Sequence, residues 1–135
     1  MQENNQVPNR KEPNKNQNQK NQKFDLEERT LTFATNVIDM INRISNNIQN
    51  IEIKKQLIRS ATSIGANYRE ANEALGKKDF VYRLKISRKE AKETIYWLNL
   101  LNSNNQPFGP EMNSLIKEAK EFIYIFTSII SKFNS

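Results

Sequence analysis

The sequence predicts an all-α protein that folds as an antiparallel, up-down-up-down four-helix bundle with a disordered N-terminal tail. The 135-residue chain contains three glycines and four prolines, and two of those prolines lie within its first 23 residues. Helix-favouring residues with a helical repeat of apolar side chains fill the remainder. Short polar connections between long helices favour antiparallel neighbours. A chain of this length is sufficient for one domain with its own core.

The first 23 residues differ in composition from the rest and are predicted to be disordered. They contain seven Asn, five Gln and two Pro, and their only apolar side chains are Met1 and Val7. Such a segment cannot bury enough apolar surface to offset the entropy of ordering it. It has five Lys or Arg and two acidic residues, so it is either a solubilising extension or a weak electrostatic arm for nucleic acid. Residues 24–135 form the predicted bundle domain.

Two helices are expected in the first half of this domain. The first runs from about residue 25 to 45, with acidic residues in its first turn, and 46–50 is a polar connection. The second runs from about residue 51 to 75, and Gly76 suits the position after its end. The predicted core side chains recur at helical spacing: Leu26, Phe33, Val37, Met40, Ile41 and Ile44 in the first helix, and Ile53, Leu57, Ala61, Ile64, Tyr68, Ala71 and Leu75 in the second.

Two further helices are expected in the second half. The third begins near Asp79 and ends within 103–106, and Pro107 and Pro110 bracket the next loop. The fourth runs from about residue 111 to 132. The predicted core residues are Phe80, Leu84, Ala91, Ile95, Leu98 and Leu101 in the third helix, and Leu115, Ala119, Phe122, Phe126, Ile129 and Phe133 in the fourth.

The composition excludes several classes of function. The chain has no Cys and no His, which removes disulfides, thiol catalysis, structural zinc and imidazole general bases. No acid–base pair with a catalytic task is evident, so we expect no enzymatic activity, no metal site and no cofactor. The N-terminus lacks the apolar segment of a secretory signal, and the longest apolar-rich run, 122–130, is shorter than the roughly 20 residues of a membrane span. We therefore expect a soluble, cytoplasmic protein without membrane contact.

A stripe of small or polar side chains runs beside the core face of the second helix. Ser63, Asn67 and Glu70 are spaced three and four residues apart, which places them along one side. A half-buried carboxylate needs a partner, and Arg83 or Arg88 of the third helix suits that role across the interface. Ser63, Asn67, Glu70 and Arg88 are therefore predicted to form a structural polar lock that fixes helix register, since no nucleophile, metal ligand or phosphate loop accompanies them.

The third helix carries a strip of lysines and tyrosines opposite its core face. The segment 77–93 contains seven basic and three acidic residues, whereas the other helices are close to neutral. Lysines interleaved with tyrosines suit a phosphate backbone with accessible bases, although an ordinary solvated face has the same pattern. The predicted nucleic-acid-binding residues, called the lysine strip below, are Lys78, Tyr82, Lys85, Lys89, Lys92 and Tyr96.

Apolar residues beside the lysine strip predict a subunit interface. Ile86, Trp97 and Leu100 lie between the core face and the strip, alongside Glu90 and Glu93. A Trp and several aliphatic side chains outside the core stripes indicate a second apolar surface, and surfaces of that kind usually mark an interface. We expect self-assembly through these five residues.

The segments 60–71 (SATSIGANYREA) and 79–98 (DFVYRLKISRKEAKETIYWL) resemble the small bacterial four-helix-bundle proteins called 23S ribosomal RNA intervening-sequence proteins. The resemblance covers roughly 25–133. It rests on a Ser-Ile-x-x-Asn-x-x-Glu run at 63–70, a Phe-x-x-x-Leu run at 80–84 and an Arg-x-x-x-x-Glu run at 88–93. Many members have Pro after the Ile and Gly after the Glu, where this chain has Gly65 and Ala71. That departure indicates a smoother second helix and a different subgroup.

The resemblance implies a homopentameric ring of up-down bundles with a nucleic-acid-binding role and no enzymatic activity. Some members are encoded within insertions in ribosomal RNA genes. A related group resembles the accessory proteins of diversity-generating retroelements, which partner a reverse transcriptase and its RNA. The expected partners are therefore further copies of this chain together with RNA or DNA. The alternative is a protein-interaction adaptor that holds a partner such as a reverse transcriptase.

Overall fold

The computed structural model describes residues 15–133, with side chains described for 25–133 except that of Gln106. Four long helices account for most of this part: α1 (Lys15–Ile41), α2 (Ile48–Asn72), α3 (Lys77–Asn104) and α4 (Gly109–Phe133). A short 3-10 helix, η2 (Gln106–Phe108), precedes α4. No strand occurs within 15–133, so the prediction of an all-α, four-helix fold is confirmed.

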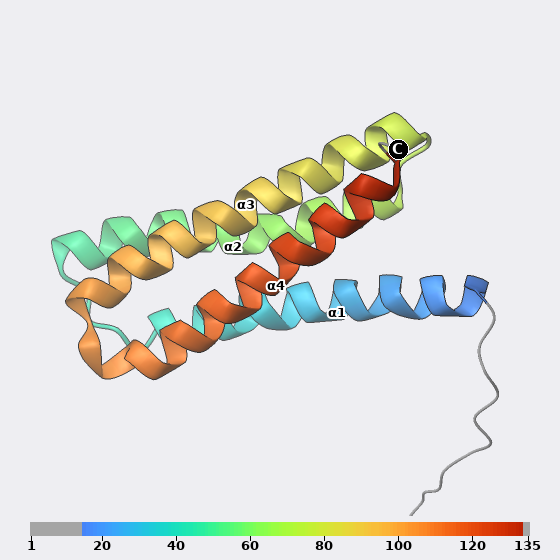
Figure 1. The fold of residues 1–135 in the computed structure, drawn as a ribbon. Helices are drawn as coiled ribbons and strands as arrows, with labels where there is room; N and C mark the ends of the chain where they lie inside the picture. The colour runs from blue at the N-terminus through green and yellow to red at the C-terminus, as the bar shows by residue number, and fades with distance from the viewer. Residues whose placement is uncertain (1–14, 134–135) are drawn as a thin grey trace, which may run out of the picture.

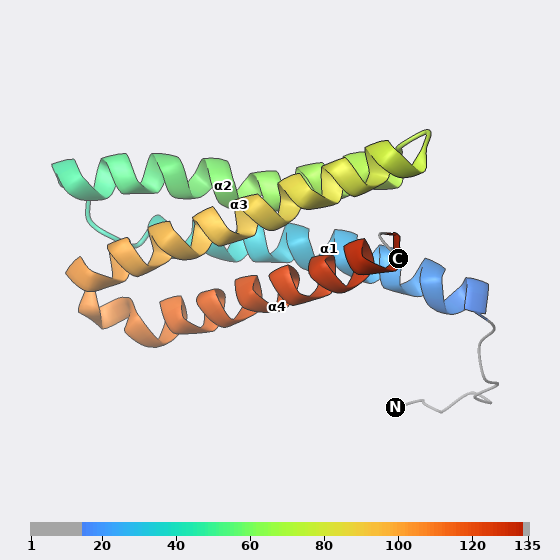
Figure 2. The same cartoon turned by 45° about the horizontal axis from the view of Figure 1, so that its top comes forward.

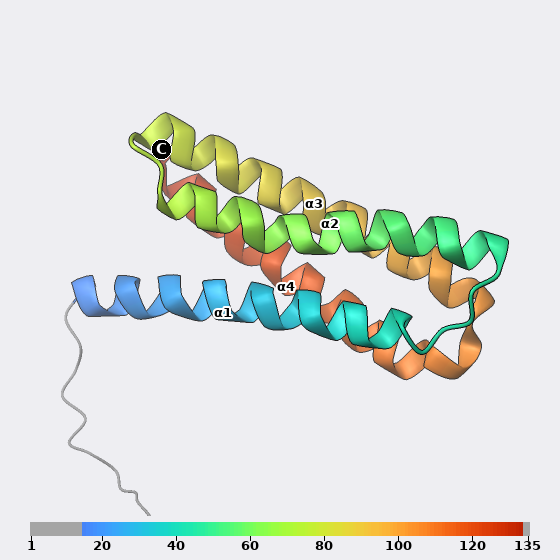
Figure 3. The ribbon, with the colours of Figure 1, turned by 180° about the vertical axis from the view of Figure 1, so that it is seen from behind.

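Consecutive helices run in opposite directions along one another (Figures 1 and 2). The view from behind in Figure 3 shows α1 and α2 side by side, with α3 and α4 beyond them. The start of α1, the turn between α2 and α3 and the end of α4 lie at one end of the molecule, and the other two connections lie at the opposite end (Figure 1). This arrangement fits the expected up-down-up-down bundle.

The bounds of α1 differ from those that the sequence predicts. The expected start is near residue 25, but α1 begins at Lys15, so residues 15–23 of the expected disordered tail are helical. After Pro13 this stretch consists of Asn, Gln and Lys, of which Gln and Lys favour helix. Adding residues to an existing helix is far easier than nucleating one, so the packed part of α1 supports this extension. Residues 1–14 lie outside the described part.

The start of α2 is set by asparagines in the preceding connection. The side chain of Asn47 accepts a hydrogen bond from the backbone N–H of Asn50 at 2.7 Å, which is the usual N-terminal cap. The buried side chain of Asn50 donates to the carbonyl of Ser45 at 2.9 Å and pairs with the side-chain amide of Asn105 at 3.1 and 3.2 Å. These bonds start α2 at Ile48, three residues before its expected beginning, and tie it to the end of α3.

Aromatic side chains fill the centre of the bundle. Phe33 of α1 packs edge-to-face against Phe122 of α4, with ring centroids 5.4 Å apart. Tyr68 of α2 stacks on Phe126 of α4 at 5.8 Å. All four were expected core residues and all are buried. Leu75 was also expected in the core, but it is fully exposed because α2 ends at Asn72 and leaves it in the turn.

Small side chains allow α2 to lie very close to both of its neighbours. The Ser87 hydroxyl of α3 donates to the backbone carbonyl of Ile64 at 3.0 Å, which requires the two backbones to approach closely. Towards α1, a methyl group at Gly65 would lie 2.8 Å from Oγ1 of Thr30. The absence of a side chain at Gly65 is therefore a packing requirement of the α1–α2 contact.

Candidate nucleic-acid interface

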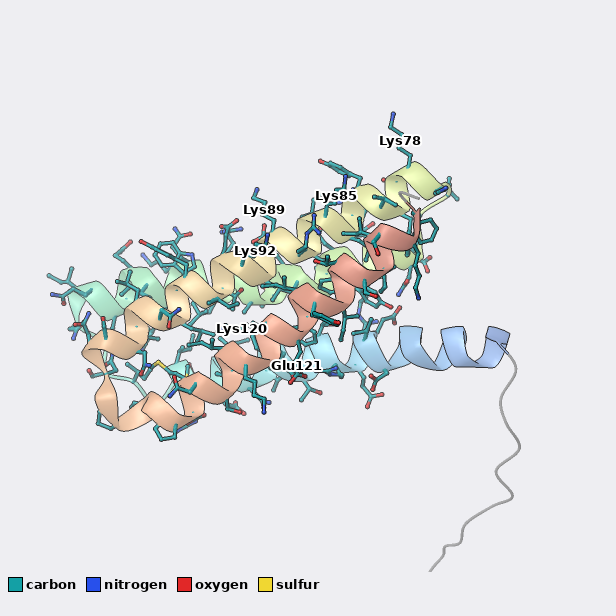
Figure 4. All side chains as sticks on the ribbon, viewed as in Figure 1. Lys78, Lys85, Lys89, Lys92, Lys120 and Glu121 are labelled. Carbon is teal, nitrogen blue, oxygen red and sulfur yellow. The ribbon has the colours of Figure 1, made fainter. Side chains whose placement is uncertain are left out.

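The six residues of the lysine strip lie along the outward face of α3, and all of them are exposed. Tyr82 and Tyr96 are 59% and 60% exposed. Figure 4 shows Lys78, Lys85, Lys89 and Lys92 spaced along the helix, with Lys78 and Lys89 projecting away from the bundle. Within 25–133, none of these four lysines forms an ion pair. The helical period predicted this exposure correctly, because the strip lies opposite the residues that α3 buries.

Two of the three acidic residues of α3, Glu90 and Glu93, are engaged by α2. Arg59 of α2 reaches Glu90 at 3.3 Å and Glu93 at 2.9 Å. Glu90 is buried and Glu93 is half-buried. Both carboxylates therefore lie at the α2–α3 contact and their charge is matched there. Asp79, the third acidic residue of α3, is exposed next to Lys78, so one acid on this helix stands against the four strip lysines.

The acidic residues of α4 are engaged by α1 in the same way. Arg29 of α1 contacts Glu118 at 2.8 Å and Glu121 at 2.9 Å, and Arg43 pairs with Glu111. The guanidinium of Arg29 also lies 5.1 Å from the centre of the Phe122 ring. Although burial disfavours its charge, hydrogen bonds and charge attraction from the two carboxylates raise the pKa of Arg29.

One further lysine adjoins the strip from α4. Arg88 donates a hydrogen bond to Oγ1 of Thr127 on α4 at 3.2 Å, so Thr127 lies on the side of α4 that faces α3. Lys120 precedes Thr127 by two helical turns and so lies on the same side. Lys120 is exposed, and Figure 4 shows it on α4 next to Glu121, which points towards α1. The positive surface therefore extends from α3 onto α4.

The structure brings together only part of the predicted polar lock. Ser63 donates to the carbonyl of Arg59 at 2.6 Å, and Asn67 donates to the carbonyl of Ser63 at 2.9 Å. The contact across to α3 comes from Arg83, which donates to the side-chain oxygen of Asn67 at 3.3 Å. Asn67 thus links the two helices, as a residue of the lock was expected to do.

Glu70 and Arg88 do not meet. Glu70 is exposed, and it makes no ion pair in the part of the chain whose side chains are described. Arg88 faces α4 instead, through Thr127. Glu70 belongs to α2, whereas Arg88 points to α4, and these two helices contact different sides of α3. Sequence reasoning missed the charged link from Arg59 to Glu90 and Glu93. The signal for it in the sequence is a pair of carboxylates three residues apart on one helix, with an arginine on the helix that precedes it.

The five residues of the predicted subunit interface differ in how far the bundle itself buries them. Ile86 and Trp97 are half-buried and Leu100 is 37% exposed, while Glu90 and Glu93 are held by Arg59 within the same subunit. Trp97 packs edge-to-face on Tyr96, with centroids 4.9 Å apart. Further exposed aliphatic side chains lie on the two helices away from the strip: Leu31 and Ile38 on α1, and Ile51 and Ile58 on α2.

The described residues offer neither a metal centre nor a membrane span. Among them, no three Asp or Glu side chains gather in a way that would hold a metal ion. None of the described helices combines the length and apolar character needed to cross a bilayer.

Comparison with known proteins decides the family. The model of the 23S rRNA-intervening sequence protein family matches residues 22–128. This chain belongs to that family. A crystal structure of a protein of unknown function from the S23 ribosomal protein family of Bacteroides thetaiotaomicron VPI-5482 is 34% identical, with a TM-score of 0.74 over 81% of this chain and 97% of that chain. No curated protein matches this chain. The family resemblance of 60–71 and 79–98 is therefore confirmed.

Proposed function

We propose that this intervening-sequence family protein is a non-enzymatic, nucleic-acid-binding protein that contacts phosphates through the lysine strip. The observation that carries the proposal is charge segregation. Apart from Asp79, the carboxylates of α3 and α4 described above are paired with arginines of α1 and α2, whereas the strip lysines and Lys120 face solvent. Such a surface attracts a polyanion. Lysine ammonium groups act as point charges and lack the planar, bidentate donor geometry of arginine, so we expect binding without strong sequence preference.

The dimensions of the strip suit a nucleic-acid strand. Fourteen residues separate Lys78 from Lys92, which corresponds to about 21 Å along a helix. Tyr82 and Tyr96 lie between and beside these lysines and offer exposed rings to bases. The name of the family refers to insertions in ribosomal RNA, which agrees with RNA as a ligand and with action in the cytoplasm.

We also propose that the protein assembles as a homo-oligomer, a pentameric ring by family resemblance. The support within this chain is the partly exposed apolar edge of α3, formed by Ile86, Trp97 and Leu100. Several copies of a weak phosphate-binding surface on one particle raise the overall affinity through avidity. Light scattering with and without RNA, at low and high salt, measures both the number of subunits and its dependence on the ligand.

The binding proposal is tested by charge reversal in the strip. The variant K85E/K89E is compared with K55E/K117E, which makes the same change of charge at exposed positions of α2 and α4 outside the strip. Fluorescence anisotropy with labelled RNA and DNA at about 50 and 200 mM salt reports affinity and its salt dependence. The strip variant should lose binding and show a smaller salt slope. Absence of binding by the wild type at low salt, or equal losses in both variants, contradicts the proposal.

The second candidate function is a protein-interaction adaptor that partners a reverse transcriptase of a diversity-generating retroelement. The exposed aliphatic side chains of α1 and α2, among them Leu31 at 57% and Ile58 at 40%, favour it. A purified reverse transcriptase should then bind the protein after nuclease treatment. The adaptor is favoured over the nucleic-acid binder if K85E/K89E leaves this binding intact and polar substitutions at Leu31 and Ile58 remove it.

A further inference from the structure

A surface pocket lies where the beginning of α3 meets the end of α4. Both segments are at the same end of the bundle in Figure 1. The pocket has a volume of about 520 Å³, which is within the usual range for ligand sites. Its lining residues are Lys77, Lys78, Val81, Tyr82, Lys85 and Phe133.

The lining combines apolar and aromatic surface with positive charge. Val81 and Phe133 are half-buried, and Tyr82 presents most of its ring to solvent. Phe133 is held in place by Phe80, whose ring centre is 5.2 Å away. The ammonium group of Lys77 lies 5.7 Å from the centre of the Phe133 ring. Among the described residues no carboxylate lines the pocket, so the three lysine charges of that lining suit an anionic ligand.

We propose that this pocket receives an unstacked base of a single-stranded nucleic acid, with Lys77, Lys78 and Lys85 on the adjoining phosphates. The proposal rests on the proposed nucleic-acid-binding function and makes it more specific. Lysines along α3 would attract single strands and duplexes alike, because both carry phosphates. An aromatic-walled pocket among those lysines favours the single strand, whose bases are free to stack on a side chain.

Continuity with the lysine strip supports this assignment. Lys78, Tyr82 and Lys85 belong to both the strip and the pocket, so a strand that lies along α3 reaches the pocket without leaving the positive surface. Lys77, Val81 and Phe133 were not among the residues predicted from the sequence. They complete the site only because the last turn of α4 packs against the first turns of α3.

Tyr82 provides the sharpest test, because it is exposed and its removal should not disturb the core. Anisotropy is measured with labelled RNA and DNA strands of about 12 nucleotides, a length within the range of single-strand binding sites, and with the matching duplexes. The wild type should bind single strands more tightly than duplexes. Y82A should weaken single-strand binding by about 5- to 150-fold, as expected for the loss of one stacking contact, and leave duplex binding nearly unchanged.

Two further variants complete the design. Y82F keeps the ring and should retain single-strand binding. Y124A removes a tyrosine of α4 that is 79% exposed and lies outside the pocket, and it should bind as the wild type does. Equal affinity for single strands and duplexes, with Y82A no different from Y124A, would overturn the pocket proposal and leave the proposed function standing. Failure of the wild type to bind any of the four probes at low salt would overturn both.

Discussion

Arg59 of α2 bridges Glu90 and Glu93 of α3, with its two terminal nitrogens 3.3 and 2.9 Å from the carboxylate oxygens. The Glu90 side chain is only 10% exposed, whereas the Arg59 side chain is 49% exposed. The contact therefore joins a buried acid to a base that solvent still reaches. It also holds Glu90 and Glu93 on the side of α3 that faces α2, away from the lysine strip.

Removal of Arg59 should destabilise the fold. R59A leaves the buried carboxylate of Glu90 without its partner, and we expect a loss of about 1–2 kcal/mol in the free energy of unfolding, since solvent access to Arg59 limits the effect. Urea denaturation measures it. K55A is the control, because Lys55 pairs with Glu52 on the same helix and both side chains are about two-thirds exposed, which predicts a change below about 0.5 kcal/mol. Similar effects in the two variants would contradict a structural role for the bridge.

Substitution of Gly65 by Ala should destabilise the protein although Ala favours helix. The added methyl group would lie 2.8 Å from Oγ1 of Thr30, a buried side chain that donates to the carbonyl of Leu26 at 2.8 Å. Overpacking of about 1–3 kcal/mol should exceed the gain of about 1 kcal/mol in helix propensity. Thermal unfolding is measured for G65A, for T30A and for the double variant. If the two side chains collide, the double variant should lose less stability than the sum of the losses of the two single variants. G109A is the control, since its methyl group would meet nothing closer than 3.7 Å.

Lys54 should stabilise the connection between α1 and α2. Its ammonium group donates to the carbonyl of Ile44 at 2.6 Å and to the side-chain oxygen of Asn46 at 2.7 Å. K54M keeps the length of the side chain and removes both bonds, so the free energy of unfolding should fall by about 1 kcal/mol. K55M, on the exposed side of the same turn, should change it little. Unchanged stability of K54M in urea titrations would show that these bonds contribute nothing.

Stability at alkaline pH should depend on Tyr68. Burial raises the pKa of its phenol above the ordinary value of 10.0, although the hydrogen bond with Asn72 acts in the opposite direction. Because the folded state holds this proton more tightly than the unfolded chain does, the contribution is present below pH 10 and is lost as the pH rises through the folded pKa. Y68F has no proton to lose there. Its stability relative to the wild type should therefore rise as the pH increases above about 10, the ordinary pKa of tyrosine.

Urea titrations at several pH values measure that difference. Y124F is the control, because it makes the same substitution at a tyrosine that is 79% exposed on α4. A constant difference between Y68F and the wild type over the whole range would show that Tyr68 ionises equally in both states.

The helices could be predicted from the sequence more reliably than their ends. The apolar spacing of residues such as Phe33, Leu57 and Phe122 identifies four helices with inward faces, because a helical period has few other structural meanings. The ends depend on single capping interactions. The cap at Asn47 starts α2 early, and the end of α2 at Asn72 exposes Leu75, which the period alone had placed in the core.

The candidate site could be predicted where one helix supplies it and not where two helices must meet. Exposure of Lys85 and Lys89 follows from their position opposite the core face of α3. The partner of Glu70 could not be found in this way, because the rotation of α2 about its axis decides which side chains reach α3. That rotation places Arg59 and Asn67 at the contact and leaves Glu70 in solvent.

The sequence by itself determined the all-α class, the four helices, the family and the basic outward face of α3. Each of these follows from the spacing and composition of residues that are close together in the chain. Only the tertiary structure decided which charges are paired and where a pocket forms. Lys77 and Phe133 are 56 positions apart in the sequence and come together because the last turn of α4 returns to the first turn of α3. A contact between such distant residues depends on how the two whole helices pack against each other. That packing is determined by all the side chains that the helices bury together, and neither residue determines it alone.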